Sequence, residues 1–457
     1  MVERERVAHD AAALPRPPLR RQPALLRRMF ADPTPVLEEL AEQLGPIYTL
    51  GGGPVRLAVV GDPTALRELL SMPTDSFSWG HKFNVLGFVV GKESMIVSDG
   101  ELHKRRRSSV QTAFSRRRLN GWIPMIVERT DAAIDQLISS LDASDEEIDL
   151  YDFGRSLVLQ IVVRSLFGEQ MAERAAEIGD LFQRPQDYLE APALKQIPHP
   201  FPRTARARVR EDRRRLDAII DEQIAWLRAE PSEDPLDVLA SLVADGTLSD
   251  GEIRDQVVTL MGAGYDTTAA SLAWMFWCVA TTPGLWDRLR AEADEVFGDS
   301  PSPDESTLAA LGLANRTMRE TTRLHPAGVI SPREAAEDVT VGGFRISKGT
   351  LILWSPHLAG RDADAWDDPL RFDPDRFLDP TDEQKALADM AWVPFGKGAR
   401  NCIGFALAQM ELTLIISRVA QRLDIASTTT TIPRPVGMVV NRPEGGAPMT
   451  VSPRSAP

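Results

Sequence analysis

The sequence predicts a mainly α-helical protein with a small β region, folded as a single large domain. Apolar residues recur at helical spacing over most of the 457 residues. Stretches with strand character are short and few, and no internal repeat or low-complexity linker divides the chain. With 43% hydrophobic and 26% charged residues, the composition is that of a globular protein with a large core.

The predicted elements follow in chain order. The first 34 residues mix proline with charge, and we interpret them as an N-terminal extension before a domain at 35–457. Helical spacing predicts helices at 35–43, 64–70, 100–112, 122–141, 152–167, 203–229, 250–282, 284–297, 311–324 and 402–423. Short pieces at 47–50, 56–60, 339–341 and 350–354 are predicted strands.

The longest predicted helix, at 250–282, has a clear start and a clear end. Ser249 and Glu252 make a Ser-x-x-Glu capping box, and Pro283 ends the pattern. Its middle reads AGYDTT at 263–268, where small and polar residues interrupt an apolar run. Such residues lower helix propensity and place polar groups where they need partners, so the interruption indicates a functional role.

Charge and hydropathy exclude several classes of protein. The 52 basic and 66 acidic side chains give a net charge of −14, which argues against nucleic acid as a partner. The first 40 residues hold no apolar stretch long enough for a signal peptide or a membrane anchor. The longest apolar run, at 269–280, suits the buried part of a helix. We therefore expect a cytoplasmic protein.

A glutamate and two arginines are predicted to form a structural lock. Glu320 and Arg323 stand three residues apart in ETTR, and Arg376 follows in FDPDRF. A buried arginine has to be paired and hydrogen-bonded, so these three side chains would hold an irregular region in place. By itself a Glu-x-x-Arg pair is most often a solvated pair on a helix surface.

Cys402 stands in the stretch FGKGARNCIGFALAQMEL at 395–412, where a glycine-rich loop meets a helical pattern. The chain has only two cysteines, which excludes a disulfide scaffold or a four-cysteine metal site. A position at a helix N-terminus is expected to lower the pKa of the Cys402 thiol from about 8.5. Cys278 lies in an apolar run without such a setting, and we interpret it as structural.

Taken together and in this order, the motifs resemble the cytochrome P450 family over about residues 35–455. The cysteine loop is the most specific of them, and its family positions are Phe395, Gly398, Arg400, Cys402 and Gly404. The remaining matches are the acid–alcohol helix at Ala263, Gly264, Asp266 and Thr267, the pair Glu320 and Arg323 with Arg376, and a His-x-x-x-Arg segment at His103 and Arg107.

The resemblance implies a cytochrome P450 fold in which residues 35–457 bind heme b, with the Cys402 thiolate as the axial ligand of the iron. Phe395 would shield the sulfur, and Gly398 and Gly404 would let the backbone approach the flat ring. The heme propionates need cationic partners when buried. By resemblance those partners are His103, Arg107, Arg333 and Arg400, while His325 and His357 are interpreted as structural.

The resemblance also implies that Asp266 and Thr267 are catalytic. A helix distortion at Ala263 and Gly264 would open a groove for dioxygen beside the heme, and the threonine hydroxyl would hold a proton-relaying water. Tyr265, between them, is bulkier than expected, and we expect it to point away from the heme.

Electrons are expected to come from another protein. The chain lacks the cysteines of an iron–sulfur cluster and has no Gly-x-Gly-x-x-Gly fingerprint after a predicted strand. NAD(P)H electrons would therefore arrive through a separate ferredoxin or flavodoxin and its reductase. The basic tracts at 104–107 and 115–118, with Lys397, would steer an acidic partner; a solvated basic helix face is an equally weighted alternative. Arg106, Arg116 and Arg117 are the tract residues expected in such a patch.

The function predicted is a heme-thiolate monooxygenase that inserts one oxygen atom into a small apolar molecule by hydroxylation or epoxidation. A terpenoid, a steroid, a fatty acid and a macrolide-like compound all fit, because the segments at 76–91 and 182–202, expected to line the pocket, are rich in apolar residues. A peroxide-driven relative is less favoured because the acid–alcohol pair is present. A non-catalytic heme carrier or sensor would not need that pair, and a cysteine-nucleophile hydrolase lacks a visible base.

Overall fold

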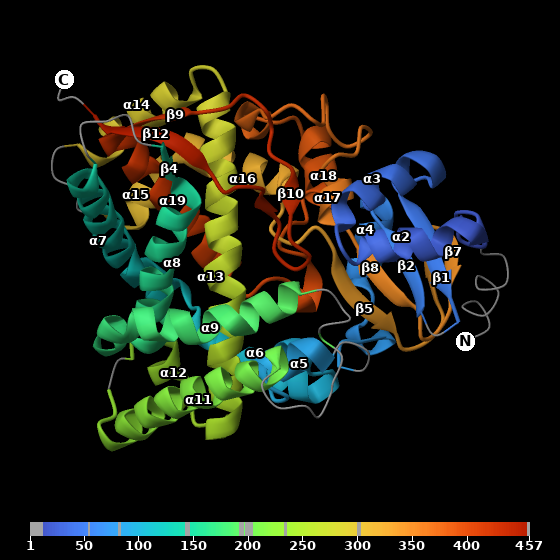
Figure 1. The fold of residues 1–457 in the computed structure, drawn as a ribbon, viewed down its shortest axis with the longest axis horizontal. Helices are drawn as coiled ribbons and strands as arrows, with labels where there is room; N and C mark the ends of the chain where they lie inside the picture. Colours follow the sequence, from blue (N-terminus) through green and yellow to red (C-terminus); the bar gives the residue numbers. More distant parts are fainter. Residues whose placement is uncertain are drawn as a thin grey trace.

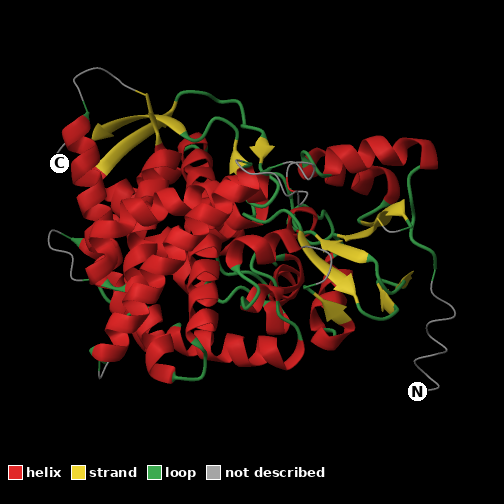
Figure 2. Cartoon of the chain, turned by 60° about the horizontal axis from the view of Figure 1, so that its bottom comes forward, coloured by secondary structure: helices red, strands yellow, loops and turns green. Residues whose placement is uncertain are grey.

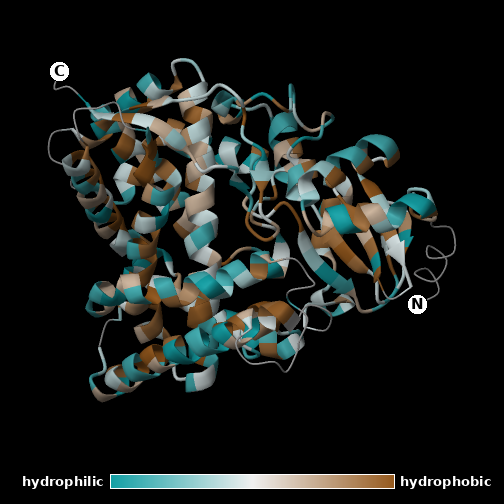
Figure 3. Ribbon diagram, in the orientation of Figure 1, coloured by the Kyte–Doolittle hydropathy of each residue, from teal (hydrophilic) through white to brown (hydrophobic). Residues whose placement is uncertain are grey.

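The computed structural model separates a large helical part from a smaller part built on a sheet (Figures 1 and 2). The structure describes residues 12–53, 55–80, 84–141, 147–191, 196, 204–232, 235–298 and 303–454. Among these residues, no helix is both long enough and apolar enough to cross a membrane. Hydrophobic residues concentrate along the strands and the inner helices, whereas outer helices carry much hydrophilic surface (Figure 3).

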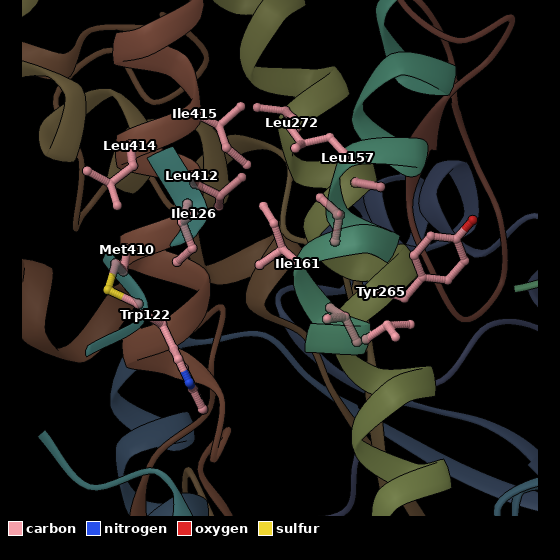
Figure 4. Close-up of a cluster of buried hydrophobic side chains, with 14 of the residues drawn as sticks. Trp122, Ile126, Leu157, Ile161, Tyr265, Leu272, Met410, Leu412, Leu414 and Ile415 are labelled. Carbon is pink, nitrogen blue, oxygen red and sulfur yellow. The ribbon is translucent and has the colours of Figure 1, made fainter. Parts of the chain in front are cut away.

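Helix α13 (Asp250–Thr281) runs through the middle of the helical part (Figure 1). Both halves of the predicted capping box are present, since the Ser249 hydroxyl accepts from the Glu252 N–H and the Glu252 carboxylate accepts from the Ser249 N–H. α13 packs against α8 (Leu150–Phe167), α16 (Gly312–Leu324) and α19 (Phe405–Arg422). Apolar side chains of α8, α13 and α19 pack together with those of α7 (Arg116–Ser140), as Figure 4 shows.

The other helices surround this centre. The helical part also holds α5 (Asn84–Val90), α6 (Gly100–Ala113), α9 (Ala175–Glu190), α11 (Ala205–Ala229), α12 (Val238–Asp245), α14 (Leu285–Phe297) and α15 (Glu305–Ala310). The sheet side holds α2 (Gln22–Met29), α3 (Pro33–Leu44), α4 (Pro63–Ser71), α17 (Pro356–Ala359) and α18 (Asp382–Ala391).

The largest sheet has five strands in the order β1-β2-β8-β5-β3. They are β1 (Ile47–Gly52), β2 (Val55–Val60), β3 (Phe77–Ser78), β5 (Ser331–Ala335) and β8 (Leu351–Trp354). β2 and β8 are parallel, with Val60 opposite Trp354, and the other pairs are antiparallel. Because β5 pairs with β8 so that Arg333 lies opposite Ile352, this central position fixes the backbone of Arg333.

Three smaller sheets complete the fold. β6 (Val339–Val341) pairs with β7 (Phe344–Ile346), and β10 (Pro435–Val436) pairs with β11 (Arg442–Pro443). A third sheet has the order β4-β12-β9, from β4 (Glu147–Asp149), β12 (Pro448–Pro453) and β9 (Leu423–Ser427). It ties the C-terminal strand to the start of α8 and the end of α19.

Every helix and strand predicted from the sequence is present, most of them with shifted ends. α7 begins at Arg116 rather than at 122, because the polar stretch RRRLNG shows no apolar periodicity although it is helical. α19 begins at Phe405, so Cys402 precedes the helix instead of opening it. The helices α2, α5, α9, α12, α15, α17 and α18 were not predicted. Leu25 and Met29 of α2 are buried in the cluster beneath the sheet, and a boundary at residue 34 stays a prediction.

The predicted lock between Glu320, Arg323 and Arg376 is confirmed. The Glu320 carboxylate accepts from the Nε of Arg323 at 2.7 Å and from the Nε of Arg376 at 2.9 Å. Arg323 also donates to the backbone carbonyls of Pro369 and Arg371. The network thus fastens the irregular segment after α17 onto α16.

Candidate functional site

The loop that carries Cys402 is closed by a backbone hydrogen bond between its two ends. The Cys402 N–H donates to the carbonyl of Phe395 at 2.7 Å. Gly396 and Gly398 have φ angles of 66° and 71°, which side chains rarely adopt. A Cβ atom on Gly398 would also lie 2.7 Å from the carbonyl oxygen of Leu70. Glycine is therefore required at position 398 by the protein itself.

Gly404 is different, because nothing in the protein crowds it. A Cβ atom there would meet only the Cys402 Sγ, at 4.0 Å, and the φ angle of −84° is ordinary. Neither packing nor backbone conformation among the described residues explains a glycine at this position. The space beside the sulfur is therefore open on the Gly404 side.

Three aromatic rings pack beside the cysteine loop. The ring of Phe395 lies 4.8 Å from that of Phe405 and 5.8 Å from that of Trp392, measured between centroids. Trp392 also meets Phe405 edge-on at 6.0 Å. Packing of this kind makes the support of the cysteine loop rigid.

The Cys402 side chain is accessible to solvent although protein surrounds it. Burial raises the pKa of its thiol above the usual range, against the opposing effects of the Gly404 N–H and the Arg107 guanidinium. The sequence-based expectation of a lowered pKa is therefore wrong for the protein without a bound metal. Loss of hydration outweighs the one backbone donor and the one cation that favour the thiolate.

Four cationic or potentially cationic side chains gather beside this loop. His103 and Arg107 lie one turn apart on α6, Arg333 is on β5, and Arg400 precedes Cys402 by two residues. The guanidinium of Arg400 lies 3.8 Å above the ring of Trp79, and that of Arg333 lies 5.4 Å from the same ring. Arg107 donates to the Asn401 side chain at 2.6 Å. The structure thus brings together all four residues that the resemblance implied.

These charges repel one another and are poorly neutralised. Burial, followed by Arg400 and Arg107, lowers the pKa of His103 to about 4. Burial lowers the pKa of Arg333 to about 10, with a further contribution from Arg400, and that of Arg400 to about 10. Within the described part of the chain, the Nε atoms of Arg333 and Arg400 are buried without a hydrogen-bond partner. Asp99 is the acid that pairs with Arg400, at 3.3 Å.

Helix α13 supplies the predicted acid–alcohol pair. Ala263 is exposed although it stands midway along this central helix, so an open space adjoins it. The Thr267 hydroxyl donates to the Ala263 carbonyl at 2.5 Å, and Asp266 is buried. The helix continues without a break through 263–268, so the distortion expected at Ala263 and Gly264 does not interrupt it. The Thr267 hydroxyl instead forms a hydrogen bond with a backbone carbonyl of the preceding turn.

The elements that carry these groups are neighbours. α13 packs against α19, which begins three residues after Cys402, and against α6, which carries His103 and Arg107. Tyr265 is buried in the same hydrophobic cluster as Leu157 and Ile161 of α8, whose members Figure 4 shows.

The predicted basic patch is not formed as expected. Arg106 is buried, where its Nε contacts Glu252 at 2.9 Å and its Nη1 donates to Ser98 at 2.6 Å. Arg116 is paired with Glu305, and Lys397 with Asp389. The prediction that Arg106 lies on the surface is wrong, because the capping glutamate of α13 also serves as its counter-ion.

Several residues at the site were missed by sequence reasoning. Trp79 and Asp99 contact Arg400, Asn401 holds Arg107, and Tyr151 contacts Asp266. Only Asn401 carried a signal, since it lies inside the cysteine motif. Cys278, by contrast, is buried as interpreted, and its pKa is raised by that burial. His325 stacks on Trp274, and His357 contacts Glu38 at 2.8 Å.

A hollow of about 1070 Å³ lies beside the cysteine loop. Trp392, Phe395, Lys397, Asn401 and Phe405 line it, together with α18 and the segment 364–377. Of the segments expected to line a substrate pocket, 84–90 forms α5 and Phe182 is buried in α9. Positions 81–83, 192–195 and 197–203 of those segments lie outside the described residues.

Comparison with known proteins gives consistent matches. The family model of cytochrome P450 matches residues 15–447. A Mycobacterium tuberculosis protein assigned as cytochrome P450 139 is 34% identical over 359 residues, which cover 76% of this chain and 81% of the relative. Pentalenene oxygenase of Streptomyces avermitilis is 31% identical over 411 residues, covering 86% and 87%.

Two further matches agree with these. Cyclooctat-9-en-7-ol 5-monooxygenase of Streptomyces melanosporofaciens is 30% identical over 379 residues, covering 81% of this chain and 80% of the relative. The solved structure of retinoic acid bound cyanobacterial CYP120A1 superposes with a TM-score of 0.83 at 23% identity, covering 93% of this chain and 96% of that one. At this identity the last match concerns the fold alone.

Proposed function

The chain belongs to the cytochrome P450 family and is a monooxygenase, and we propose that it inserts one atom of dioxygen into a terpenoid at a heme held by Cys402. The overall reaction consumes substrate, dioxygen, two electrons and two protons, and yields hydroxylated substrate and water. Epoxidation of a substrate double bond has the same balance.

Three structural observations fit a bound heme. The Cys402 thiol is accessible within a protein-dense setting. The space beside Gly404 is left open by the protein. A cluster of cations, with two buried guanidinium nitrogens unpartnered among the described residues, has too few acids to neutralise it. Two heme propionates would supply the missing negative charge.

Cys402 would bind the iron as a thiolate. Metal coordination deprotonates a thiol outright, which overcomes the raised pKa of the free side chain. When bound, the heme supplies dioxygen activation, which thiolate ligation favours by donating electron density. Phe395 would shield the sulfur, and Gly398 would hold the loop in its turn.

The cationic cluster would hold the propionates. Arg107, Arg333 and Arg400 carry the charge, while the lowered pKa of His103 makes it a neutral hydrogen-bond partner at physiological pH. Trp79 supports Arg400 and Arg333 through its ring face. Asp99 keeps Arg400 oriented through an ion pair.

Asp266 and Thr267 would hold and pass on the protons that the reaction consumes. The Thr267 hydroxyl, now on the Ala263 carbonyl, can accept a hydrogen bond while it donates one, so it can hold a water. Asp266 is buried beside it, and burial raises the pKa of its carboxyl, which favours the protonated form that can supply a proton. A heme carrier or sensor would have no use for this pair.

Electrons would come from NAD(P)H through a separate ferredoxin or flavodoxin and its reductase, and the protein would act in the cytoplasm. The hollow beside the cysteine loop is a suitable contact surface, because it reaches Phe395 and Phe405. Its lining carries six aspartates and five basic residues, so charge there is mixed rather than basic.

The cluster of incompletely neutralised cations beside an accessible thiol is the observation that carries the proposal. The substrate class rests on the two relatives named for pentalenene and cyclooctat-9-en-7-ol, both terpenoid oxygenases. Heme-loaded protein should be titrated with terpenoid hydrocarbons, steroids, fatty acids and macrolides, following the Soret band. Each binder should then be incubated with NADPH, a surrogate ferredoxin and its reductase.

Terpenoids should shift the Soret band and gain one oxygen atom. Preferred oxidation of another class would overturn the terpenoid assignment. Loaded protein that reduces dioxygen with none of these classes oxidised would favour the carrier or sensor.

A further inference from the structure

Two side chains from the first turns of α8 contact the buried Asp266 carboxylate. The Tyr151 hydroxyl donates to Asp266 Oδ1 at 3.1 Å, and the Nε of Arg155 lies 3.8 Å from the same oxygen. Tyr151 and Arg155 are one helical turn apart, so both side chains leave the same face of α8 toward α13. One hydrogen bond and one longer ion-pair contact thus meet at the same oxygen of the carboxylate.

Arg155 is itself fixed by its surroundings. Its guanidinium carbon lies 5.7 Å from the ring centroid of Tyr151 and 5.5 Å from that of Tyr265. Its Nη2 contacts the side chain of Gln183 on α9. A guanidinium between two aromatic faces has few alternative positions, so its charge stays beside Asp266.

The charged groups that face Asp266 come from three elements besides α13. Burial has the largest effect on the pKa of Asp266 and raises it. Arg155, the hydrogen bond from Tyr151 and Arg442 of β11 lower this pKa, whereas Glu190 of α9 raises it. Burial and Asp266 both raise the pKa of Tyr151, so its hydroxyl remains protonated and can only donate to a carboxylate. Among the groups that lower the pKa of Asp266, Arg155 and Tyr151 therefore have the largest effects.

Solvent exposure is higher for the α8 side chains than for the Asp266 carboxylate that they contact. The side chain of Asp266 is 6% exposed, whereas that of Arg155 is 24% exposed and Tyr151 is half-buried. The α8 side chains thus connect a nearly inaccessible acid to the accessible surface.

We propose that Tyr151 and Arg155 are positioning residues that orient the Asp266 carboxyl toward proton transfer, and that protons enter the protein along the first turns of α8. This inference rests on the proposed function, in which Asp266 and Thr267 deliver protons to dioxygen. The transfer is of protons only: one proton leaves the Asp266 carboxyl toward the Thr267 hydroxyl or its water, and one from solvent at α8 replaces it.

The test uses heme-loaded, full-length protein and the variants Tyr151→Phe and Arg155→Gln. Arg164→Gln is the matched control, because Arg164 is on the same helix and pairs with Glu169 instead. Peroxide formed per electron is measured across pH. Both test variants should raise it several-fold and move the pH midpoint upward, since each loses a group that lowers the pKa of Asp266.

A second readout does not depend on turnover. The infrared band of the protonated Asp266 carboxyl, identified by its loss in Asp266→Asn, is titrated in the resting protein. Its midpoint should rise in Tyr151→Phe and Arg155→Gln and stay unchanged in Arg164→Gln. Adding Tyr151→Phe to Asp266→Asn should cause no further uncoupling, because both changes act through one carboxyl.

The two levels of the proposal fail separately. If Asp266→Asn and Thr267→Ala are as well coupled as the parent, the proton-delivery function itself is wrong. If those two uncouple the reaction while Tyr151→Phe leaves both coupling and the infrared midpoint unchanged, the positioning role is wrong. Tyr151→Phe decides the matter even if Arg155→Gln does not fold, since it removes one hydroxyl and keeps the ring.

Discussion

Arg323 donates two parallel hydrogen bonds to Glu320, from Nε at 2.7 Å and from Nη2 at 2.8 Å, and neither side chain is exposed. Removing either partner leaves an uncompensated charge in the interior, which costs more than the intact pair contributes. The pair also anchors the segment at 367–376, because Arg376 bonds to the same carboxylate. Stability of this region therefore depends on both members.

We predict that Glu320→Gln lowers the free energy of unfolding by about 3–5 kcal/mol. Arg323→Lys should be nearly as damaging, since a lysine cannot make the two parallel bonds. The matched control is Arg288→Gln, which breaks the exposed pair with Asp375 and should cost about 0.5 kcal/mol. Urea unfolding followed by circular dichroism measures all three, and equal small losses would contradict a buried lock.

Glu411 on α19 should make stability depend on pH. It is buried beside Thr268, and burial raises its pKa to about 8. Below about pH 4.5 the carboxyl is protonated in both states, so its full contribution to stability is present there. As pH rises toward 8 the unfolded chain ionises first, and that contribution is lost.

Glu411→Gln should therefore flatten the fall in stability between pH 4.5 and 8, by about 3–5 kcal/mol. Thermal unfolding at a series of pH values provides the measurement. Glu177→Gln, at an exposed position, serves as the control and should leave the slope unchanged. A parental slope in Glu411→Gln would show that the group titrates at an ordinary pKa.

Loss of the Thr267 hydroxyl should uncouple the reaction. In Thr267→Ala, heme content should stay normal while product per electron falls by about 10-fold and peroxide rises. Thr267→Ser keeps a hydroxyl and should retain most of the coupling. Oxygen uptake, peroxide and product are measured together, and an alanine variant as well coupled as the parent would argue against a proton-delivery role.

Lys397 is the one member of the expected basic patch that lines the hollow beside the cysteine loop. Lys397→Glu should slow the first electron transfer from an acidic ferredoxin a few-fold at low salt. The effect should fade near physiological ionic strength, where the Debye length is about 8 Å. Stopped-flow reduction measures it, with the exposed Lys348→Glu as the control. Identical rates at every salt concentration would show that partner binding does not use this charge.

The features that the sequence predicted well are those set by local chemistry. The cap at Ser249 and the stop at Pro283 lie within a few residues of the ends they determine, so α13 was placed almost to the residue. The positive φ angle at position 398 requires glycine, and a short sequence motif contains that glycine directly.

The features that the sequence did not predict depend on contacts between distant segments. Trp79 and Asp99 contact Arg400 although they lie some 300 residues earlier in the chain, and no sequence spacing predicts such a contact. The basic tract at 104–107 predicts a surface position for Arg106, but Glu252 of another helix pairs with it in the interior. The predicted lowering of the Cys402 pKa considered only the local helix dipole. It left out the desolvation imposed by the rest of the fold, which raises this pKa.

The central claim is that Cys402 holds a heme through its thiolate. The most direct test is the spectrum of the reduced protein with carbon monoxide, recorded for the parent, Cys402→Ser and Cys278→Ala. The parent and Cys278→Ala should show the red-shifted Soret band of thiolate-ligated heme, and Cys402→Ser should lose it even where it retains heme. A band that persists in Cys402→Ser, or is absent from the heme-loaded parent, would contradict the account.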